Sequence, residues 1–137
     1  MYLFDTDVLS QVMRPVPLVS LLVRLAALPP SDQFTSAINV GELIYGAHRS
    51  ERREYLLRQM DDRLWPNLKI LSFDRRSGEI YGRVRAELEK RRQPLAEPDL
   101  RIAAIALSND FTVVTGNVRH FGRVPDLRVE NWLATDD

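Results

Sequence analysis

Five oxygen-bearing side chains stand at or near the ends of strands and helices expected in this 137-residue chain. They are Asp5, Asp7, Glu42, Asp99 and Asn117. Carboxylates that lie close together repel one another, and burying them costs free energy unless a cation lies among them. A site that offers only oxygen ligands favours Mg²⁺ or Mn²⁺ over Zn²⁺. These residue types therefore suggest a divalent-metal site, provided that the fold brings the positions together.

Each of these residues also has a simpler explanation when it is taken alone. Asp5 has the position of a helix cap, Asp99 suits the dipole at the first turn of a helix, and Asn117 is a common turn residue. Glu42 is more informative because it lies off the apolar stripe of its expected helix, on a side where glycines let another element approach. The metal-site hypothesis thus depends on the joint placement of these residues.

Apolar runs and helical spacing divide the chain into alternating strands and helices. Short apolar runs predict strands at residues 2–4, 33–36, 68–73, 112–115 and 127–129. Helical spacing predicts helices over 8–13, from about 17 to the prolines at 29–30, over 38–48, after a Ser50 cap to about 64, after an Asp74 cap to about 92, and over 99–108 behind Pro98. The second of these helices is expected to face the core through Leu18, Leu21, Leu22 and Leu25.

This order of elements predicts the fold class. Parallel neighbours need a crossover between them, so we expect an α/β fold with a central parallel sheet of about four to five strands and helices on both faces. In open α/β sheets, ligands bind just beyond the carboxyl ends of the strands. Asp5, Asp7 and Asn117 follow expected strands directly, so this rule places them at one rim of the sheet.

Composition excludes several other kinds of protein. The absence of cysteine rules out disulfides, thiolate zinc sites, iron–sulfur clusters and cysteine nucleophiles. Nineteen basic and nineteen acidic residues balance, so neither a cationic nucleic-acid coat nor an acidic tail describes the chain. No apolar run reaches the roughly 20 residues of a membrane helix, and no secretory signal precedes Tyr2. We expect a cytoplasmic protein that does not contact a membrane.

Several sequence motifs resemble one known family. Residues 2–10 (YLFDTDVLS) resemble the start of PIN-domain proteins, especially the VapC and FitB-like toxins of bacterial toxin–antitoxin pairs. Residues 38–46 (INVGELIYG) and 98–106 (PDLRIAAIA) are similar to the second and third acidic motifs of that family. Residues 115–121 (TGNVRHF) resemble the fourth, and residues 129–132 (VENW) resemble its usual close. The resemblance implies a PIN-like three-layer fold in a single domain over residues 1–137.

The resemblance also implies a chemistry and assigns residues to it. PIN-domain toxins are endoribonucleases that use Mg²⁺, or alternatively Mn²⁺, to hydrolyse RNA phosphodiester bonds. The match carries their catalytic positions onto Asp5, Glu42, Asp99 and Asn117. Asp5 and Asp99 are then the direct metal ligands, and Thr6, Asp7 and Thr115 support the site. The fourth position is often Asp in the family, so Asn117 leaves one or two metal ions open, and His120 stands where an Asp is common.

The resemblance implies partners as well. Family members cleave RNA, usually form homodimers, and are inhibited by a small antitoxin protein that inserts into a groove near the site. RNA phosphates need positive charge around an acidic pocket, and arginine supplies seventeen of the nineteen basic residues. The arginines considered for this contact are Arg49, Arg52, Arg53, Arg91, Arg92, Arg101 and Arg119. Most of them have a simpler explanation as a solvated helix face or as partners of helical glutamates.

Two alternatives from other functional classes remain open at this point. An Asp-Thr-Asp sequence after a first strand also occurs in HAD-like phosphotransferases, in which the first Asp is a nucleophile. That chemistry usually needs a lysine near the phosphate, and the chain offers only Lys69 and Lys90. The second alternative is a PIN-fold binding module that has lost its chemistry, which the Asn117 position makes conceivable.

Overall fold

Five parallel strands form the centre of the computed structural model, which describes residues 1–134. The last residues of the expected domain, 135–137, lie outside the described part. The strands are β1 (Tyr2–Phe4), β2 (Gln33–Ser36), β3 (Lys69–Leu71), β4 (Thr112–Val114) and β5 (Val129–Glu130). Their order in the sheet is β3-β2-β1-β4-β5, and each neighbouring pair is parallel. The chain adds β2 and then β3 on one side of β1, and it later adds β4 and β5 on the other side. The direction in which strands are added therefore reverses between β1 and β4.

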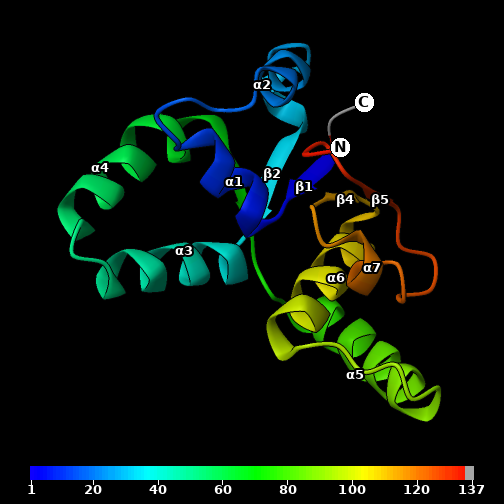
Figure 1. The fold of residues 1–137 in the computed structure, drawn as a ribbon. Coiled ribbons are helices and arrows are strands. Elements are labelled where there is room, and N and C mark those ends of the chain that lie inside the picture. The colour runs from blue at the N-terminus through cyan, green and yellow to red at the C-terminus, as the bar shows by residue number, and fades with distance from the viewer. Residues whose placement is uncertain (135–137) are drawn as a thin grey trace.

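Helices cover both faces of this sheet, as the alternation of elements predicts (Figure 1). They are α1 (Thr6–Val12), α2 (Val19–Ala26), α3 (Ala37–Arg49), α4 (Arg53–Arg63), α5 (Arg75–Lys90), α6 (Glu97–Asn109) and α7 (Val118–Phe121). In Figure 1, α1 to α4 gather on one side of the strands and α5 to α7 on the other. No helix within residues 1–134 is long and apolar enough to cross a membrane.

Side chains of the central strands pack into two separate hydrophobic cores, because successive side chains point to opposite faces of a strand. Leu3 and Val113 pack into the core beneath α5, α6 and α7. Phe4 and Val114 pack into the other core, beneath α1 to α4. The α6 helix is apolar nearly all round, as the sequence predicts, and Ile102 to Ala106 are buried. Burial on both faces fixes the register of β1 against β4, so their ends meet at a defined place.

Some local predictions are wrong. Ser50 does not cap α4: its side chain accepts from the backbone N–H of Arg52 (3.0 Å), and α4 begins only at Arg53. The β3 and β5 strands are shorter than predicted and start later, because each is an edge strand with one neighbour. Leu22 is 40% exposed rather than packed in the core, although Leu21 beside it is fully buried. The short α7 helix was not predicted, because a single turn gives no periodic signal.

Candidate active site

Asp5 lies at the carboxyl end of β1 and caps helix α1. It is 7% exposed, and three donors hold its carboxylate. Oδ1 accepts from the backbone N–H of Thr6 (2.8 Å) and from Nδ2 of Asn39 (3.0 Å), and Oδ2 accepts from the hydroxyl of Thr115 (2.7 Å). A buried carboxylate is stable only with such donors, and they fix its orientation at the point where the sheet topology reverses.

Asn39 is a site residue that the sequence interpretation missed. It is fully buried at the start of α3, where it forms a capping box with Ser36. Its Oδ1 accepts from the Ser36 backbone (3.3 Å) and hydroxyl (2.6 Å), which leaves Nδ2 to donate to Asp5 and to Oγ1 of Thr6 (3.0 Å each). The three-residue spacing from Ser36 was the available signal. Asn39 therefore ties the start of α3 to the end of β1.

Glu42 lies almost one turn after Asn39 on the same helix and is half-buried. Its Oε1 accepts a hydrogen bond from the hydroxyl of Thr6 (2.9 Å), the same group that receives Nδ2 of Asn39. Burial raises the pKa of Glu42, and the charge of Asp5 adds to this effect. Glu42 thus faces the end of β1 rather than open solvent, although it lies off the main apolar stripe of its helix.

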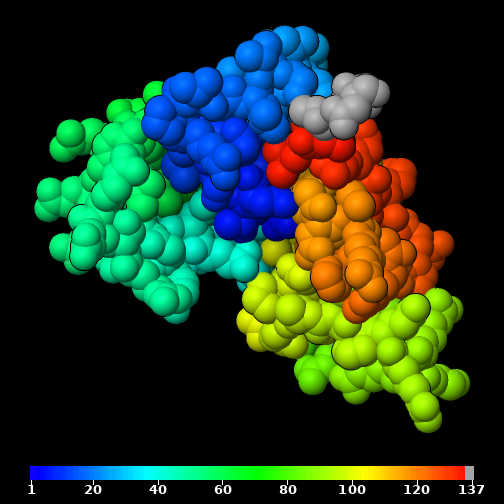
Figure 2. All heavy atoms as spheres, viewed as in Figure 1, coloured from blue at the N-terminus to red at the C-terminus, as the bar shows by residue number. Residues whose placement is uncertain are grey.

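Asp99 stands in the first turn of α6, behind Pro98. Burial and then the charges of Asp5, Glu42 and Asp7, in that order, raise the pKa of Asp99 to about 6. This shift shows that four acidic groups from three helices and a strand end act on one another. Figure 2 shows the surface hollowed between the cyan atoms of α3 and the yellow atoms of α6, the helices that carry Glu42 and Asp99.

Asp7 connects α1 to the loop after β4. Its Oδ2 accepts from the backbone N–H of Gly116 (2.8 Å), while burial, followed by the charge of Asp5, raises the pKa of Asp7. A Cβ atom at residue 116 would lie 2.8 Å from this same oxygen, so a larger residue there would require the Asp7 side chain to shift. Asp7 therefore has a structural role in closing the rim, whatever it contributes to the charge of the site.

Thr115 and Asn117 complete the rim from β4. The Thr115 hydroxyl donates to Asp5 and accepts from the backbone N–H of Asn117 (3.0 Å). The side-chain oxygen of Asn117 is hydrogen-bonded to Nδ1 of His120 on α7. His120 is thus held by Asn117 at the rim, where its side chain is exposed, and His48 is exposed on the surface of α3.

The acidic residues share no basic partner. Within residues 1–134, no lysine, arginine or histidine forms an ion pair with Asp5, Asp7, Glu42 or Asp99. Of the arginines considered from the sequence, Arg91 pairs with Glu87 and Arg101 with Glu97. Across the same residues, no group of three or more histidine or acidic side chains is closed into a metal-binding arrangement. The carboxylates therefore act on one another through their charges, but they do not form a complete set of metal ligands in this arrangement.

Replacing Asn39 with alanine is expected to destabilise the protein by about 3 kcal/mol, because it removes one of the three donors to buried Asp5 and the acceptor of the buried Ser36 hydroxyl. Urea denaturation followed by circular dichroism measures this change. The matched control is Asn67→Ala, since the Asn67 side chain bonds only an exposed backbone carbonyl, that of Arg63. We expect the control to change stability by less than about 0.5 kcal/mol; equal effects of the two substitutions would contradict a central role for Asn39.

Comparisons with known proteins agree with this geometry. The PIN domain family model matches residues 2–127. The chain is 35% identical over 134 residues to ribonuclease VapC2 of Haemophilus influenzae, covering 96% of this chain and 98% of that protein. It is 37% identical over 105 residues to the tRNA(fMet)-specific endonuclease VapC of Salmonella typhimurium, covering 77% and 79% of the two chains.

Solved structures give the same result. The crystal structure of DNA-bound VapBC from Salmonella typhimurium matches with a TM-score of 0.88 and 32% identity, covering 96% of this chain and 97% of that chain. FitAcB from Neisseria gonorrhoeae matches with a TM-score of 0.87 and 30% identity, covering 96% and 98%. The chain therefore belongs to the PIN-domain family, among the VapC ribonucleases that are the toxins of toxin–antitoxin pairs.

Proposed function

We propose that this chain hydrolyses RNA phosphodiester bonds with Mg²⁺ or Mn²⁺ at the site formed by Asp5, Glu42, Asp99 and Asn117. The observation that carries the proposal is the concentration of acidic side chains there. Burial, and then the charges of the neighbouring acids, raise the pKa of Asp99 to about 6, and these acids have no basic partner in residues 1–134. Such an arrangement costs stability in the isolated protein, and a divalent cation removes that cost. The reversal of sheet topology between β1 and β4 is also where ligands bind in this type of fold.

The donor set fits a hard cation. A carboxylate has about four lone-pair positions, and the hydrogen bonds to Asp5 use three of them. Asp99 accepts no side-chain or loop hydrogen bond within the described chain, so its oxygens remain available. Asp5 and Asp99 would therefore hold the metal directly, and Glu42 and Asn117 would act directly or through water. Bound there, the ion would lower the pKa of a water and neutralise charge on the phosphate.

The protein's own groups would prepare and complete the reaction. Thr6 and Asn39 hold Glu42 and Asp5 through a continuous chain of hydrogen bonds, from Asn39 to Asp5 and Thr6 and from Thr6 to Glu42. Within residues 1–134 no group donates a hydrogen bond to Oε2 of Glu42, and the raised pKa of Glu42 suits a general base that takes the proton of the attacking water. Thr115 orients Asp5 from the opposite side and places the backbone of Asn117 at the rim. Asp7 supports this rim through Gly116.

We extend the partners of the relatives to this chain in the same proposal. VapBC and FitAcB are complexes, so a cognate antitoxin protein is the expected inhibitor. We also propose that the chain forms a homodimer and works in the cytoplasm, where its RNA substrate is found. The name of the Salmonella relative specifies tRNA(fMet), which makes initiator tRNA the first substrate to test.

Neither alternative chemistry is favoured by a specific observation. Lys69 lies on the edge strand β3, with its Nζ 5.8 Å from the Phe34 ring, and Lys90 ends α5, so neither lysine serves a phosphate bound at Asp5. A module without chemistry would not need Asp5, Glu42 and Asp99 close together with no ion-pair partner in residues 1–134.

Metal removal is the direct test of the proposal. We expect purified protein to cut RNA with Mg²⁺ or Mn²⁺, to stop in EDTA, and to recover when excess metal is restored. Gel analysis of a labelled tRNA measures the cleavage. Cleavage that continues unchanged in EDTA would contradict the metal mechanism, and failure to cut any RNA with either metal would contradict the nuclease proposal as a whole.

A further inference from the structure

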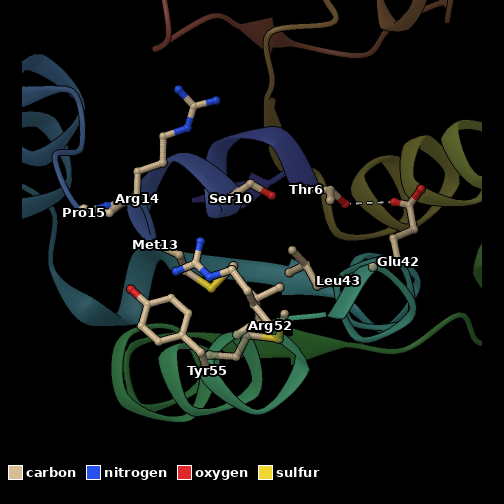
Figure 3. A pocket seen from close by; sticks show the side chains of 12 residues that line it. Thr6, Ser10, Met13, Arg14, Pro15, Glu42, Leu43, Arg52 and Tyr55 are labelled. Carbon is tan, nitrogen blue, oxygen red and sulfur yellow. Dashed lines mark hydrogen bonds between the residues drawn. The ribbon is translucent and has the colours of Figure 1, made fainter. Parts of the chain in front are cut away.

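A pocket of about 330 Å³ opens beside the acidic cluster, between α1 and α4 (Figure 3). Thr6 and Glu42, joined by their hydrogen bond, line one end of it, and Tyr55 and Pro15 line the other. Its remaining apolar lining includes Met13, Leu43, Leu56 and Met60. The pocket is therefore continuous with the site through two of its own side chains.

One wall of the pocket carries an aromatic ring with a cation stacked on it. The guanidinium of Arg52 lies 4.3 Å from the centre of the Tyr55 ring, which is 39% exposed. No acidic side chain in residues 1–134 forms an ion pair with Arg52. A flat π surface and an unneutralised planar cation thus stand at the opening of a mostly apolar hollow.

We propose that this pocket binds an unpaired nucleobase next to the scissile phosphate of the RNA, with Tyr55 and Arg52 as its stacking platform. The proposal rests on the proposed nuclease function and specifies its substrate as single-stranded or looped RNA. Bases that are free of a duplex stack on tyrosine rings and on arginine guanidinium planes, and the cation also attracts the neighbouring phosphate. Met13 and Tyr55 line the same pocket as Glu42, so a base seated between them would occupy the pocket that Glu42 closes at its other end (Figure 3).

The charges at the pocket favour RNA over a protein segment as the occupant. A cationic side chain that reached toward Glu42 through this opening would pass Arg52, which repels it. A purely apolar segment would cover Arg52, Thr6 and Glu42 without offering them partners, which costs free energy. A nucleotide offers a partner to each part of the lining, because its base packs on the apolar surface, its phosphate faces the guanidinium, and its amino and hydroxyl groups can donate to Glu42.

An abasic scan of the RNA tests the subsite. The cut is first mapped in a short single-stranded RNA, and the base at each position on either side of it is then removed in turn. With native protein, removing the base that fills the pocket should slow cleavage about tenfold. With Tyr55→Leu, the intact RNA should be cut about tenfold more slowly, and removing that same base should then have almost no further effect.

The control variant carries a similar pair outside the pocket. Tyr45 on α3 is 62% exposed, has Arg49 at 5.4 Å and does not line the cavity, so Tyr45→Leu should keep the native rate and the native abasic profile. Arg52→Gln gives an independent second variant, which should also reduce the effect of removing that base. Both replaced side chains are at the surface, so unchanged thermal unfolding confirms that each variant folds.

Two results would overturn the subsite. A Tyr55→Leu protein that cuts intact RNA at the native rate, with the native abasic profile, would assign the pocket to a protein ligand instead. An effect of equal size in Tyr45→Leu would show that the loss is not local to the pocket. Cleavage by native protein in either case keeps the nuclease proposal intact, whereas native protein that cuts no RNA overturns both proposals together.

Discussion

Replacing Asp5 with asparagine is expected to reduce RNA cleavage by about a thousandfold or more while the fold is retained. The loss follows from removing the charge at the point where β1 ends and where the other acidic residues converge. Initial rates on one labelled RNA, measured with Mg²⁺ for both proteins, give the ratio. The expected effect is larger than that of any supporting residue, because Asp5 is the acid that the other site residues hold in place.

The fold tolerates this substitution for a geometric reason. The side of Asp5 that meets the N–H groups of Thr6 and Asn39 still presents an oxygen in asparagine. The new Nδ2 group then faces the Thr115 hydroxyl, which can turn and accept. Asp61→Asn, at an exposed acid on α4, is the matched control and should keep native activity. Equal cleavage by Asp5→Asn and native protein would place the chemistry elsewhere or in a contaminant.

Asp99→Asn is expected to abolish cleavage and yet raise the melting temperature of the metal-free protein at pH 7.5. Burial and the neighbouring carboxylates raise the pKa of Asp99 to about 6, so its charge at neutral pH opposes folding. Asparagine keeps the size and polarity of the side chain without that charge. Thermal unfolding in EDTA measures the gain, and cleavage of a labelled RNA with Mg²⁺ measures the loss of activity.

The pH dependence of this gain has a defined sign. A group whose pKa is raised by folding stabilises the folded state most below its unfolded pKa, about 4 for aspartate, and that contribution is lost as the pH rises through about 6. The advantage of Asp99→Asn over native protein should therefore be largest above pH 6 and shrink as the pH falls toward 4. Other acids change stability with pH in the opposite direction; Asp74 is one, because hydrogen bonding to Ser77 lowers its pKa. Their contribution is the same in both proteins, so it cancels when the two are compared at each pH. An asparagine variant that melts below native protein at pH 7.5 would contradict this account.

The regular elements of the core could be predicted from the sequence because their patterns are local. The apolar runs of β1 and β4 and the all-round apolar α6 each indicate, within a few residues, that the element is buried. Edge elements were predicted less well. Ser50 has the right type for a cap, but its hydroxyl accepts from Arg52 in a turn that precedes the helix. That choice depends on how α3 and α4 pack, which no local pattern contains.

The site was harder to predict than the core because its parts meet only in three dimensions. The positions of Asp5, Glu42 and Asp99 followed from motifs, but their mutual effect on ionisation required the folded arrangement. Asn39 was missed because a polar residue in the first turn of a helix usually faces solvent, whereas the closing of β2 against β1 buries it. The pocket beside Tyr55 likewise joins residues of α1, α3 and α4 that share no sequence signal.

The position of β1 in the middle of the sheet has a consequence for synthesis of the protein. Asp5 is synthesised 110 residues before its partner Thr115, which reaches it only when β4 inserts beside β1. Until β4 has been synthesised, the proposed site lacks the Thr115 hydroxyl that holds Asp5, so we expect the capacity to cut RNA to arise only after that step. The interval between the synthesis of β1 and that of β4 is therefore time in which the proposed antitoxin can be made.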